Sequence, residues 1–190
     1  MHHLFSERTP VSRRSFLKAG LIAGATLALP VPAFALPGGK RAAPRVISLF
    51  NIHTGERLNN AVFWENGRYL DDALREIDHL LRDYRTDEVL PIDPGLLDIL
   101  NVICRKESGE GAIQVISGYR SPATNAELAR RSDGVARHSL HMEGKAIDIR
   151  LPGCDLAQLR RTAISLGRGG VGYYPDSGFV HVDTGRVRAW

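Results

Sequence analysis

The sequence has little of several things that would each indicate a particular class of protein. It holds two cysteines in 190 residues, and they form no C-x-x-C pair, so nothing indicates a cysteine-bound zinc site or a dithiol redox motif. Its uncharged, mostly apolar stretch at residues 19–29 is far below the roughly 20 residues that a membrane-spanning helix needs. It has no internal repeat or low-complexity tract. A composition of 43% hydrophobic and 24% charged residues instead predicts an ordinary globular domain.

The N-terminal segment has the order of an export signal. Residues 12–18, SRRSFLK, contain a pair of arginines, an apolar run follows, and Ala33-Phe34-Ala35 matches an A-x-A cleavage pattern. This order predicts a twin-arginine signal peptide over residues 1–35. A membrane anchor is the alternative, but the apolar run is short and prolines follow it. We therefore expect export to the periplasm, with no stable membrane insertion after cleavage.

Most of the excess positive charge belongs to this signal. Residues 1–35 carry four basic side chains and one acidic side chain, and so supply +3 of the formal net charge of +4. The mature chain keeps only +1. The pI near 9.3 therefore gives little support for a nucleic-acid partner, and none is expected.

The cysteines, Cys104 and Cys154, both lie in the mature part. An oxidising compartment permits a disulfide between them. Two buried free thiols are the alternative, because Cys104 lies within the apolar pattern of a predicted helix. The sequence leaves both possibilities open.

The mature chain changes its hydrophobic period several times. Residues 36–44 are rich in Pro and Gly and predict a tether. A helix is predicted from Leu70 to Tyr84, where apolar residues recur every three or four positions. The other predicted helices are 94–108, 122–131 and 155–166, and the predicted strands are 45–50, 56–64, 113–117, 146–149, 170–174 and 178–183. This order predicts an α+β domain over residues 45–190, with a small, mainly antiparallel sheet and helices packed on it.

Three residues of the second half are candidate ligands for a metal ion. His141 follows a loop rich in Ser, Gly and Arg, Asp148 lies between isoleucines of a predicted strand, and His181 lies between two valines. A buried, unpaired carboxylate is costly, so Asp148 needs a partner. Each residue by itself is more often structural. Because a catalytic zinc site takes about three protein ligands, the three together favour a metal site.

The motifs around these residues resemble a known family. Residues 139–148, SLHMEGKAID, resemble the S-x-H-x-x-G-x-A-x-D signature of the zinc peptidases that include D-alanyl-D-alanine carboxypeptidases, D,D-dipeptidases and phage L-alanyl-D-glutamate endolysins. Residues 117–121, SGYRS, resemble a segment that precedes this signature, and residues 170–174 and 179–183 resemble the closing pair of strands. The resemblance runs from about residue 113 to residue 185 and, with the signal, is closest to the exported branch of murein endopeptidases.

This resemblance implies a fold, a cofactor and an activity. The fold is that of hedgehog and D-Ala-D-Ala-peptidase domains, and the cofactor is Zn²⁺ bound by His141, Asp148 and His181. The family role of the SGYRS arginine, binding substrate and stabilising the oxyanion, is carried to Arg120. A guanidinium suits that role through its fixed donors and permanent charge; a surface arginine that closes a turn is the alternative. The implied activity is zinc-dependent hydrolysis of peptide cross-links in peptidoglycan, whose peptides are the expected partner.

One position departs from the family pattern. Many members place the general base, a Glu or Asp, three residues before the last histidine, where this chain has Gly178. Asp183 is the predicted catalytic base instead, because residues i and i+2 of a strand share a face and its carboxylate would lie beside His181. A carboxylate that only orients the histidine is the alternative.

Three further residues are predicted to bind substrate: Ser139, His138 and Tyr173. His138 could also form an H-x-x-H pair with His141, but the surrounding loop favours a wall of the pocket, and core packing is the alternative for Tyr173. Asn125 is expected to be solvated or capping.

Two other functions stay open for the chain, which is expected to be a monomer. A D,D-carboxypeptidase would trim a terminal D-alanine, whereas an endopeptidase needs a cleft with room on both sides of the metal. A non-catalytic, zinc-containing module that binds peptidoglycan would account for the missing acid at position 178.

Overall fold

The computed structural model describes residues 42–107, 111–131 and 135–190. The predicted signal peptide, residues 1–35, and residues 36–41 of the predicted tether lie outside these described residues. The first strand begins at Arg45, where the predicted domain begins.

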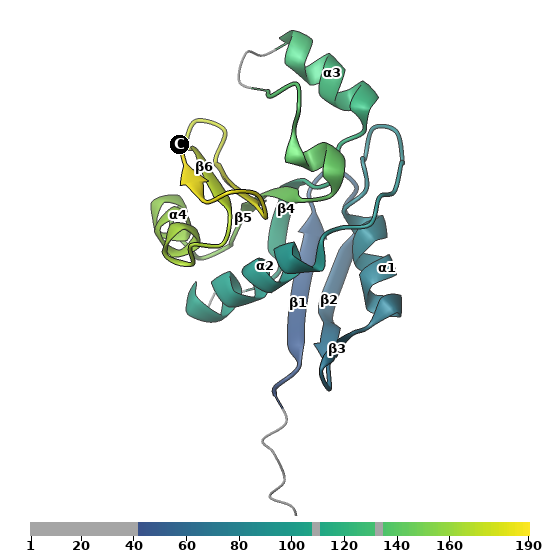
Figure 1. Cartoon of the computed structure of the whole chain (residues 1–190), viewed down its shortest axis with the longest axis vertical. Helices are drawn as coiled ribbons and strands as arrows, with labels where there is room; N and C mark the ends of the chain where they lie inside the picture. The colour runs from purple at the N-terminus through teal and green to yellow at the C-terminus, as the bar shows by residue number, and fades with distance from the viewer. Residues whose placement is uncertain (1–41, 108–110, 132–134) are drawn as a thin grey trace, which may run out of the picture. The chain divides into compact units, whose positions relative to one another are not determined.

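The described residues form an α+β fold built on a single sheet (Figure 1). The elements in chain order are β1 (Arg45–Asn51), β2 (Arg57–Glu65), β3 (Arg68–Tyr69), α1 (Asp71–Leu80), α2 (Pro94–Glu107), β4 (Ile113–Ser117), α3 (Pro122–Arg131), the 3₁₀ helix η1 (Leu140–Glu143), β5 (Ala146–Arg150), α4 (Leu156–Ser165), β6 (Gly170–Tyr174), β7 (Phe179–Asp183) and β8 (Arg188–Ala189).

The sheet has eight strands in the order β3-β2-β1-β4-β5-β7-β6-β8. Neighbouring strands are antiparallel except for β1 with β4 and β6 with β8, which are parallel. The first two strands, β1 and β2, form an antiparallel hairpin at the start of the domain. The α+β class and the mainly antiparallel sheet are confirmed.

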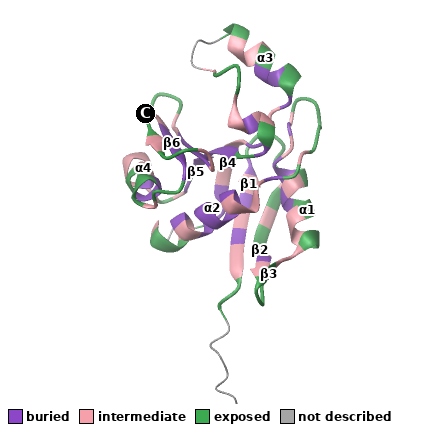
Figure 2. Cartoon of the chain, in the orientation of Figure 1, coloured by how far each residue is buried: buried purple, intermediate pink, exposed green. Residues whose placement is uncertain are grey.

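The hydrophobic core lies where helices cover the middle of the sheet. α2 packs against β1 and α4, and α4 packs against β6 and β7. The leucines and isoleucines of α2 that face the sheet are fully buried, as are Ile147 and Ile149 of β5 (Figure 2). α3, in contrast, stands beyond the end of β4 rather than over the sheet (Figure 1).

The predicted helix at residues 70–84 ends earlier than its pattern indicated. α1 ends at Leu80, although Leu81 and Tyr84 continue the three-and-four spacing. The carbonyl of Leu81 accepts a hydrogen bond from the backbone N–H of Tyr119 at 2.7 Å, and Asp83 is buried with its own backbone partners. Long-range contacts thus override local helix propensity here. The short strands β3 and β8 were not predicted, because two residues carry no alternation.

Both cysteines are free thiols in the structure. Burial raises the pKa of each to about 11, so they are not activated nucleophiles.

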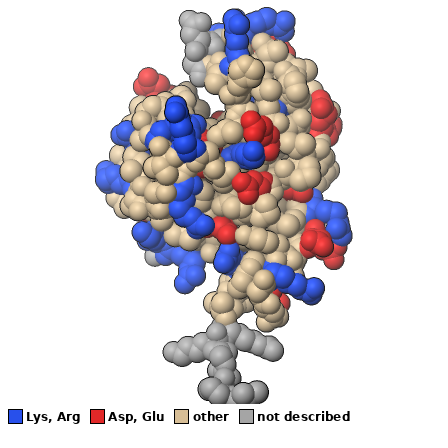
Figure 3. Space-filling view, in the orientation of Figure 1, with Lys and Arg blue, Asp and Glu red and all other residues tan. Residues whose placement is uncertain are grey.

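None of the helices in the described ranges is both long and apolar enough to cross a bilayer. On the face drawn in Figure 3, Lys and Arg gather over the left side, whereas acidic and basic side chains are mixed at the centre and right.

Candidate metal centre

The register of the sheet brings polar residues from three strands, and a glycine from a fourth, into one row. Asp148 of β5 is directly opposite Ser117 of β4 on one side and His181 of β7 on the other, and His181 is opposite Gly172 of β6. Residues directly opposite one another in antiparallel strands share a face. Because side chains alternate along each strand, Ile147 and Ile149 point to the helices while Asp148 points to the opposite face.

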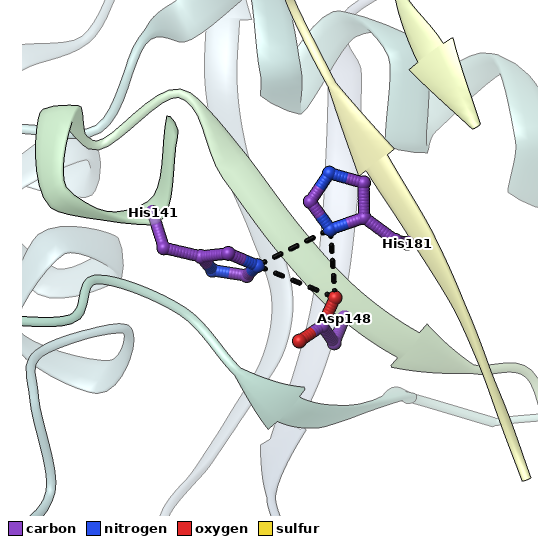
Figure 4. A group of neighbouring side chains, drawn as sticks. All are labelled: His141, Asp148 and His181. Carbon is purple, nitrogen blue, oxygen red and sulfur yellow. Dashed lines mark hydrogen bonds and ion pairs between the residues drawn. The ribbon is translucent and has the colours of Figure 1, made fainter. Parts of the chain in front are cut away.

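His141 reaches this row from outside the sheet. It lies in η1, which begins after Ser139, whose hydroxyl accepts a hydrogen bond from the backbone N–H of His141 at 3.3 Å. The three side chains converge as Figure 4 shows: His141 Nε2 lies 3.2 Å from His181 Nδ1 and 3.3 Å from Asp148 Oδ1, and the last two atoms are 2.9 Å apart. All three residues are buried. They are the group predicted from the sequence, here brought together.

The hydrogen bonds on the outer side of each imidazole assign its tautomer. His141 Nδ1 lies 2.8 Å from the carbonyl oxygen of Gly118, and His181 Nε2 lies 3.1 Å from Asp183 Oδ2. Oxygens of these kinds can only accept, so each of these ring nitrogens carries the proton. In the neutral tautomers the nitrogens that face Asp148 keep their lone pairs, whereas in protonated His181 the Nδ1 donates to Asp148 Oδ1 at 2.9 Å.

This arrangement fits a divalent metal ion. Two imine nitrogens and a carboxylate oxygen, all acceptors, lie within 3.3 Å of one another in a buried place, and only a cation or an added proton relieves their repulsion. A tetrahedral zinc site, with metal–ligand distances of 2.0–2.1 Å, has ligand atoms about 3.3 Å apart. A partner on the far nitrogen of each ligand histidine is also the usual support of a metal site.

The ionisation of the cluster follows from the same contacts. Burial raises the pKa of Asp148, but the charge and hydrogen bonds of His141 and His181 outweigh it and hold this pKa well below its ordinary value. Burial lowers the pKa of His181, and the two neighbouring carboxylates outweigh that effect, so its pKa is raised. Asp148 is therefore available as an anionic ligand.

Asp183 is fully buried and has many donors. Its carboxylate accepts hydrogen bonds from the backbone N–H groups of Gly170 (2.9 Å) and Gly185 (2.8 Å) and from the guanidinium of Arg188 (2.7 and 3.2 Å), besides His181. Burial raises its pKa, and these donors hold the pKa well below its ordinary value. It shares the face of His181 as expected, but it contacts the nitrogen that faces away from the cluster. Of the two roles left open by the sequence, this geometry favours the orienting carboxylate.

Arg120 is held beside the cluster by a short segment anchored on both sides. The carbonyl of Leu81 accepts from the backbone N–H of Tyr119 at 2.7 Å, and Asp83 Oδ2 accepts from that of Ser121 at 2.8 Å. Arg120 itself donates its backbone N–H to the carbonyl of His141 at 3.2 Å. The same segment thus positions a cation and a ligand histidine.

The guanidinium of Arg120 lies 3.6 Å (Nη2) from Asp148 Oδ2. Nη1 donates to Asn125 Oδ1 and Nη2 to Ser117 Oγ, both at 3.3 Å, whereas the buried Nε has no hydrogen-bond partner among the described residues. Burial lowers the pKa of Arg120. Asn125, expected to be solvated, is instead buried and also donates to the carbonyls of Ala136 and Arg137.

A cleft of about 340 Å³ opens over the cluster. Ser139 and His138, both predicted to bind substrate, line it. Tyr173 does not: it is opposite Val180 on the core face, with the guanidinium of Arg160 5.0 Å from its ring centroid. The tyrosine of β6 that lines the cleft is Tyr174, because successive strand residues point to opposite faces.

The structure gives a reason for the glycine at position 178. Gly178 closes the tight turn between β6 and β7, with its N–H bonded to the carbonyl of Pro175 at 3.1 Å and a φ of +68°. A residue with a side chain is strained at this φ. Its carbonyl also accepts from the guanidinium of Arg150. An acid at this position would need a different turn.

Sequence reasoning missed several residues around the site: Asp83, Arg188, Trp190 and the carbonyl of Gly118. A buried aspartate after a helix and a Trp beyond the last predicted strand carry no local pattern. Only the register and the packing reveal them.

Comparisons with known proteins match nearly the whole chain. Residues 40–190 match a family model described as peptidoglycan L,D-endopeptidase MepK, and residues 10–30 match a model of the twin-arginine translocation pathway signal sequence. The chain is 42% identical to the peptidoglycan L,D-endopeptidase MepK of Escherichia coli K12 over 97% of its own length and 100% of that protein. It is also 42% identical to the probable peptidoglycan L,D-endopeptidase MepK of Haemophilus influenzae, over 94% of its length and 95% of that protein.

One solved structure, the L-Ala D-Glu endopeptidase ChiX of Serratia marcescens, overlaps partly. Its TM-score is 0.34 at 22% identity, over 40% of this chain and 62% of that one. This overlap is too small to bear on fold or function.

Proposed function

The chain belongs to the peptidoglycan L,D-endopeptidase MepK family, and from this premise we propose that it is a periplasmic, metal-dependent endopeptidase that hydrolyses peptide cross-links of peptidoglycan. The twin-arginine signal at its N-terminus directs it out of the cytoplasm. The observation that carries the proposal is the convergence of His141, Asp148 and His181 on one point at the floor of a cleft. A family match by itself does not supply those ligands.

We propose zinc as the ion, with His141 Nε2, Asp148 and His181 Nδ1 as its ligands. Two imidazole nitrogens and one carboxylate oxygen suit zinc. When bound, the ion polarises the scissile carbonyl and lowers the pKa of a water molecule, from about 15.7 towards about 7 in favourable sites.

The chain's own residues keep the ligands ready. The carbonyl of Gly118 and the carboxylate of Asp183 hold the protons of the two imidazoles on their outer nitrogens, so the inner lone pairs stay free. We propose the orienting role for Asp183, since its donors leave its carboxylate little freedom to accept a further proton. The buried row excludes water from all but the cleft side.

Arg120 is proposed to bind substrate and to stabilise the oxyanion. Its guanidinium lines the cleft next to Asp148, and its Nε has no partner among the described residues. Negative charge that develops on the carbonyl oxygen of the scissile bond would meet this fixed cation. Donors placed before the reaction begins need no reorganisation. Ser139 and His138, which also line the cleft, are proposed to contact the peptide.

The relatives' names further support a bond between an L- and a D-configured centre as the one that is cut. We also propose that residues 1–35 are removed on export, that residues 36–44 form a tether, and that residues 45–190 form one monomeric catalytic domain. Size-exclusion chromatography with light scattering tests the monomer.

The decisive experiment incubates the exported protein with defined peptidoglycan dimers, cross-linked through either an L,D or a D,D peptide bond, with and without a chelator. We expect L,D-linked dimers to become monomers only without chelator, as followed by chromatography and mass spectrometry. Loss of a terminal D-alanine without loss of dimers would indicate a carboxypeptidase. Intact dimers beside a folded, metal-loaded protein would indicate a binding module.

A further inference from the structure

One side of the cleft is an aromatic wall formed by Tyr174, Phe179 and Trp190. The rings of Tyr174 and Phe179 stack with their centroids 4.7 Å apart. Trp190 donates its indole N–H to the hydroxyl of Tyr174 at 2.9 Å, which links it to the pair. The hydroxyl proton of Tyr174 has no acceptor among the described residues and is free to donate to a ligand.

The position of Trp190 is built into the sheet. Its backbone N–H donates to the carbonyl of Val171 at 3.1 Å, and its carbonyl accepts from the N–H of Tyr173 at 3.0 Å. The indole lies over Gly172, where an added Cβ would come within 2.8 Å of the ring. The absent side chain at position 172 therefore makes room for the indole.

This packing sets Trp190 beside the metal cluster. Gly172 is the residue opposite His181, and the rings of Trp190 and His181 have centroids 5.3 Å apart. The guanidinium of Arg188, paired with Asp183, lies 4.8 Å from the centroid of the indole and holds it from another side. Yet Trp190 remains 45% exposed. An aromatic side chain that is held in place beside a buried site and is still half-exposed is suited to contact a ligand.

We propose that the aromatic wall, through Trp190 beside His181, is the subsite for the amino-acid residue that flanks the scissile bond, and that it binds the aliphatic arm of that residue. This proposal rests on the proposed function. The distance between the rings of Trp190 and His181 indicates which part of the substrate Trp190 can contact. An extended chain advances by at most 3.3–3.6 Å per residue, so a surface about 5 Å from a ligand histidine meets the residue next to the scissile bond. Glycan strands, several residues away along the stem peptide, are beyond its reach.

The intrinsic fluorescence of the chain can report on ligand binding, because Trp64 is its only tryptophan besides Trp190. Trp64 lies in β2, which is not among the cleft-lining elements, and stacks with Arg45. In Trp64→Phe, emission comes from Trp190 alone; in Trp190→Phe it comes from Trp64 alone. Titrating both metal-loaded variants with a glycan-free stem tripeptide should change the emission of Trp190 saturably and leave that of Trp64 unchanged.

Kinetics on L,D-linked dimers complete the test. We expect Trp190→Ala to raise KM about tenfold or more, through the lost apolar contact, with Trp190→Phe recovering most of it. Metal affinity, measured by chelator competition, should change less than about threefold, because the indole makes no bond to a ligand atom. For scale, a tenfold change in affinity corresponds to about 1.4 kcal/mol.

The outcomes separate the subsite from the function. The subsite is overturned if the parent protein cuts dimers, the KM of Trp190→Ala is unchanged and the emission of Trp190 does not respond to the peptide. The proposed function would still stand in that case. A loss of metal affinity at unchanged KM would make Trp190 a structural support for His181, and also overturns it. If the parent cuts no dimer, the proposed function fails and the subsite fails with it, and a saturable change in Trp190 emission would then show only that the wall binds the peptide.

Discussion

The two faces of strands β5 and β7 differ in polarity at the metal centre, although their residues alternate along the same short segments. On one face, Ile147 and Ile149 of β5 and the valines of β7 are buried against the helices. On the other face, Asp148, His181 and Asp183 are also buried but polar. The first face gains stability from every methyl group it buries.

The polar face meets the cost of burial in a different way. Its outer groups are satisfied within the chain, by Gly118 and Arg188, whereas its three inner atoms face one another as acceptors. A cation bound between these three acceptor atoms would relieve their repulsion. The comparison therefore predicts that changes on the two faces separate stability from metal binding, and three substitutions test this. A fourth, at Asp83, tests the charge that anchors the segment holding Arg120.

The largest effect is expected at Asp148. Asp148→Asn removes the anionic ligand while keeping the shape of the side chain, and loss of the ion's contribution of several kcal/mol corresponds to a fall in cleavage of about 10³-fold. Metal content is measured by elemental analysis beside the cleavage assay. Asp176→Asn, an exposed carboxylate in the turn before β7, is the matched control and should retain activity. Full activity in Asp148→Asn would remove the basis of the metal centre.

On the opposite face, Ile149→Ala should act on stability instead. Ile149 is 0% exposed against the helices, and truncation of such a residue lowers the free energy of unfolding by about 3 kcal/mol. The protein that remains folded should bind metal with affinity within a few-fold of the parent. Urea unfolding and chelator competition give the two numbers. If metal affinity fell while stability held, the two faces would not be independent.

Asp183→Asn distinguishes the two roles of this carboxylate. An orienting role predicts a loss of metal affinity of about 10- to 100-fold, with activity restored at saturating metal. A role as general base predicts the reverse, with metal retained and activity lost even at saturation. Metal titration followed by cleavage assays therefore decides between them.

The smallest effect is expected at Asp83, a buried carboxylate outside the cluster. Burial raises its pKa, but hydrogen bonds from Thr124 and from the backbone N–H groups of Ser121 and Arg85 outweigh this and hold the pKa below its ordinary value. A depressed pKa contributes stability above the unfolded value of about 3.9, and this is lost as pH falls through the folded pKa. Asp83→Asn should thus lower the free energy of unfolding by about 1.5 kcal/mol at pH 7.

The pH dependence supplies the check for Asp83. Thermal melts of the parent and of Asp83→Asn should differ at pH 7 and converge as the pH is lowered below about 4, where the parent carboxylate takes up its proton. A difference that stayed constant with pH would mean that the charge of Asp83 is not what anchors the segment that holds Arg120.

Much of the fold followed from local patterns. The strand at 113–117 and the helix at 122–131 have the predicted bounds, because turn residues and periodicity mark both ends. The helix predicted to Tyr84 ended at Leu80, since the carbonyl of Leu81 is needed by Tyr119, 38 positions along the chain. Such pairings have no local signal.

The same division holds for the site. The sequence by itself determined which residue types could bind a metal, because a carboxylate between isoleucines and a histidine between valines must be satisfied where they are buried. It also determined export, through a contiguous signal. Only the tertiary structure decided that Tyr174 rather than Tyr173 faces the cleft, that Asp183 contacts the outer nitrogen of His181, and that Trp190 fills the space above Gly172. Those outcomes depend on strand register, and register is set by contacts between segments that are distant in the chain.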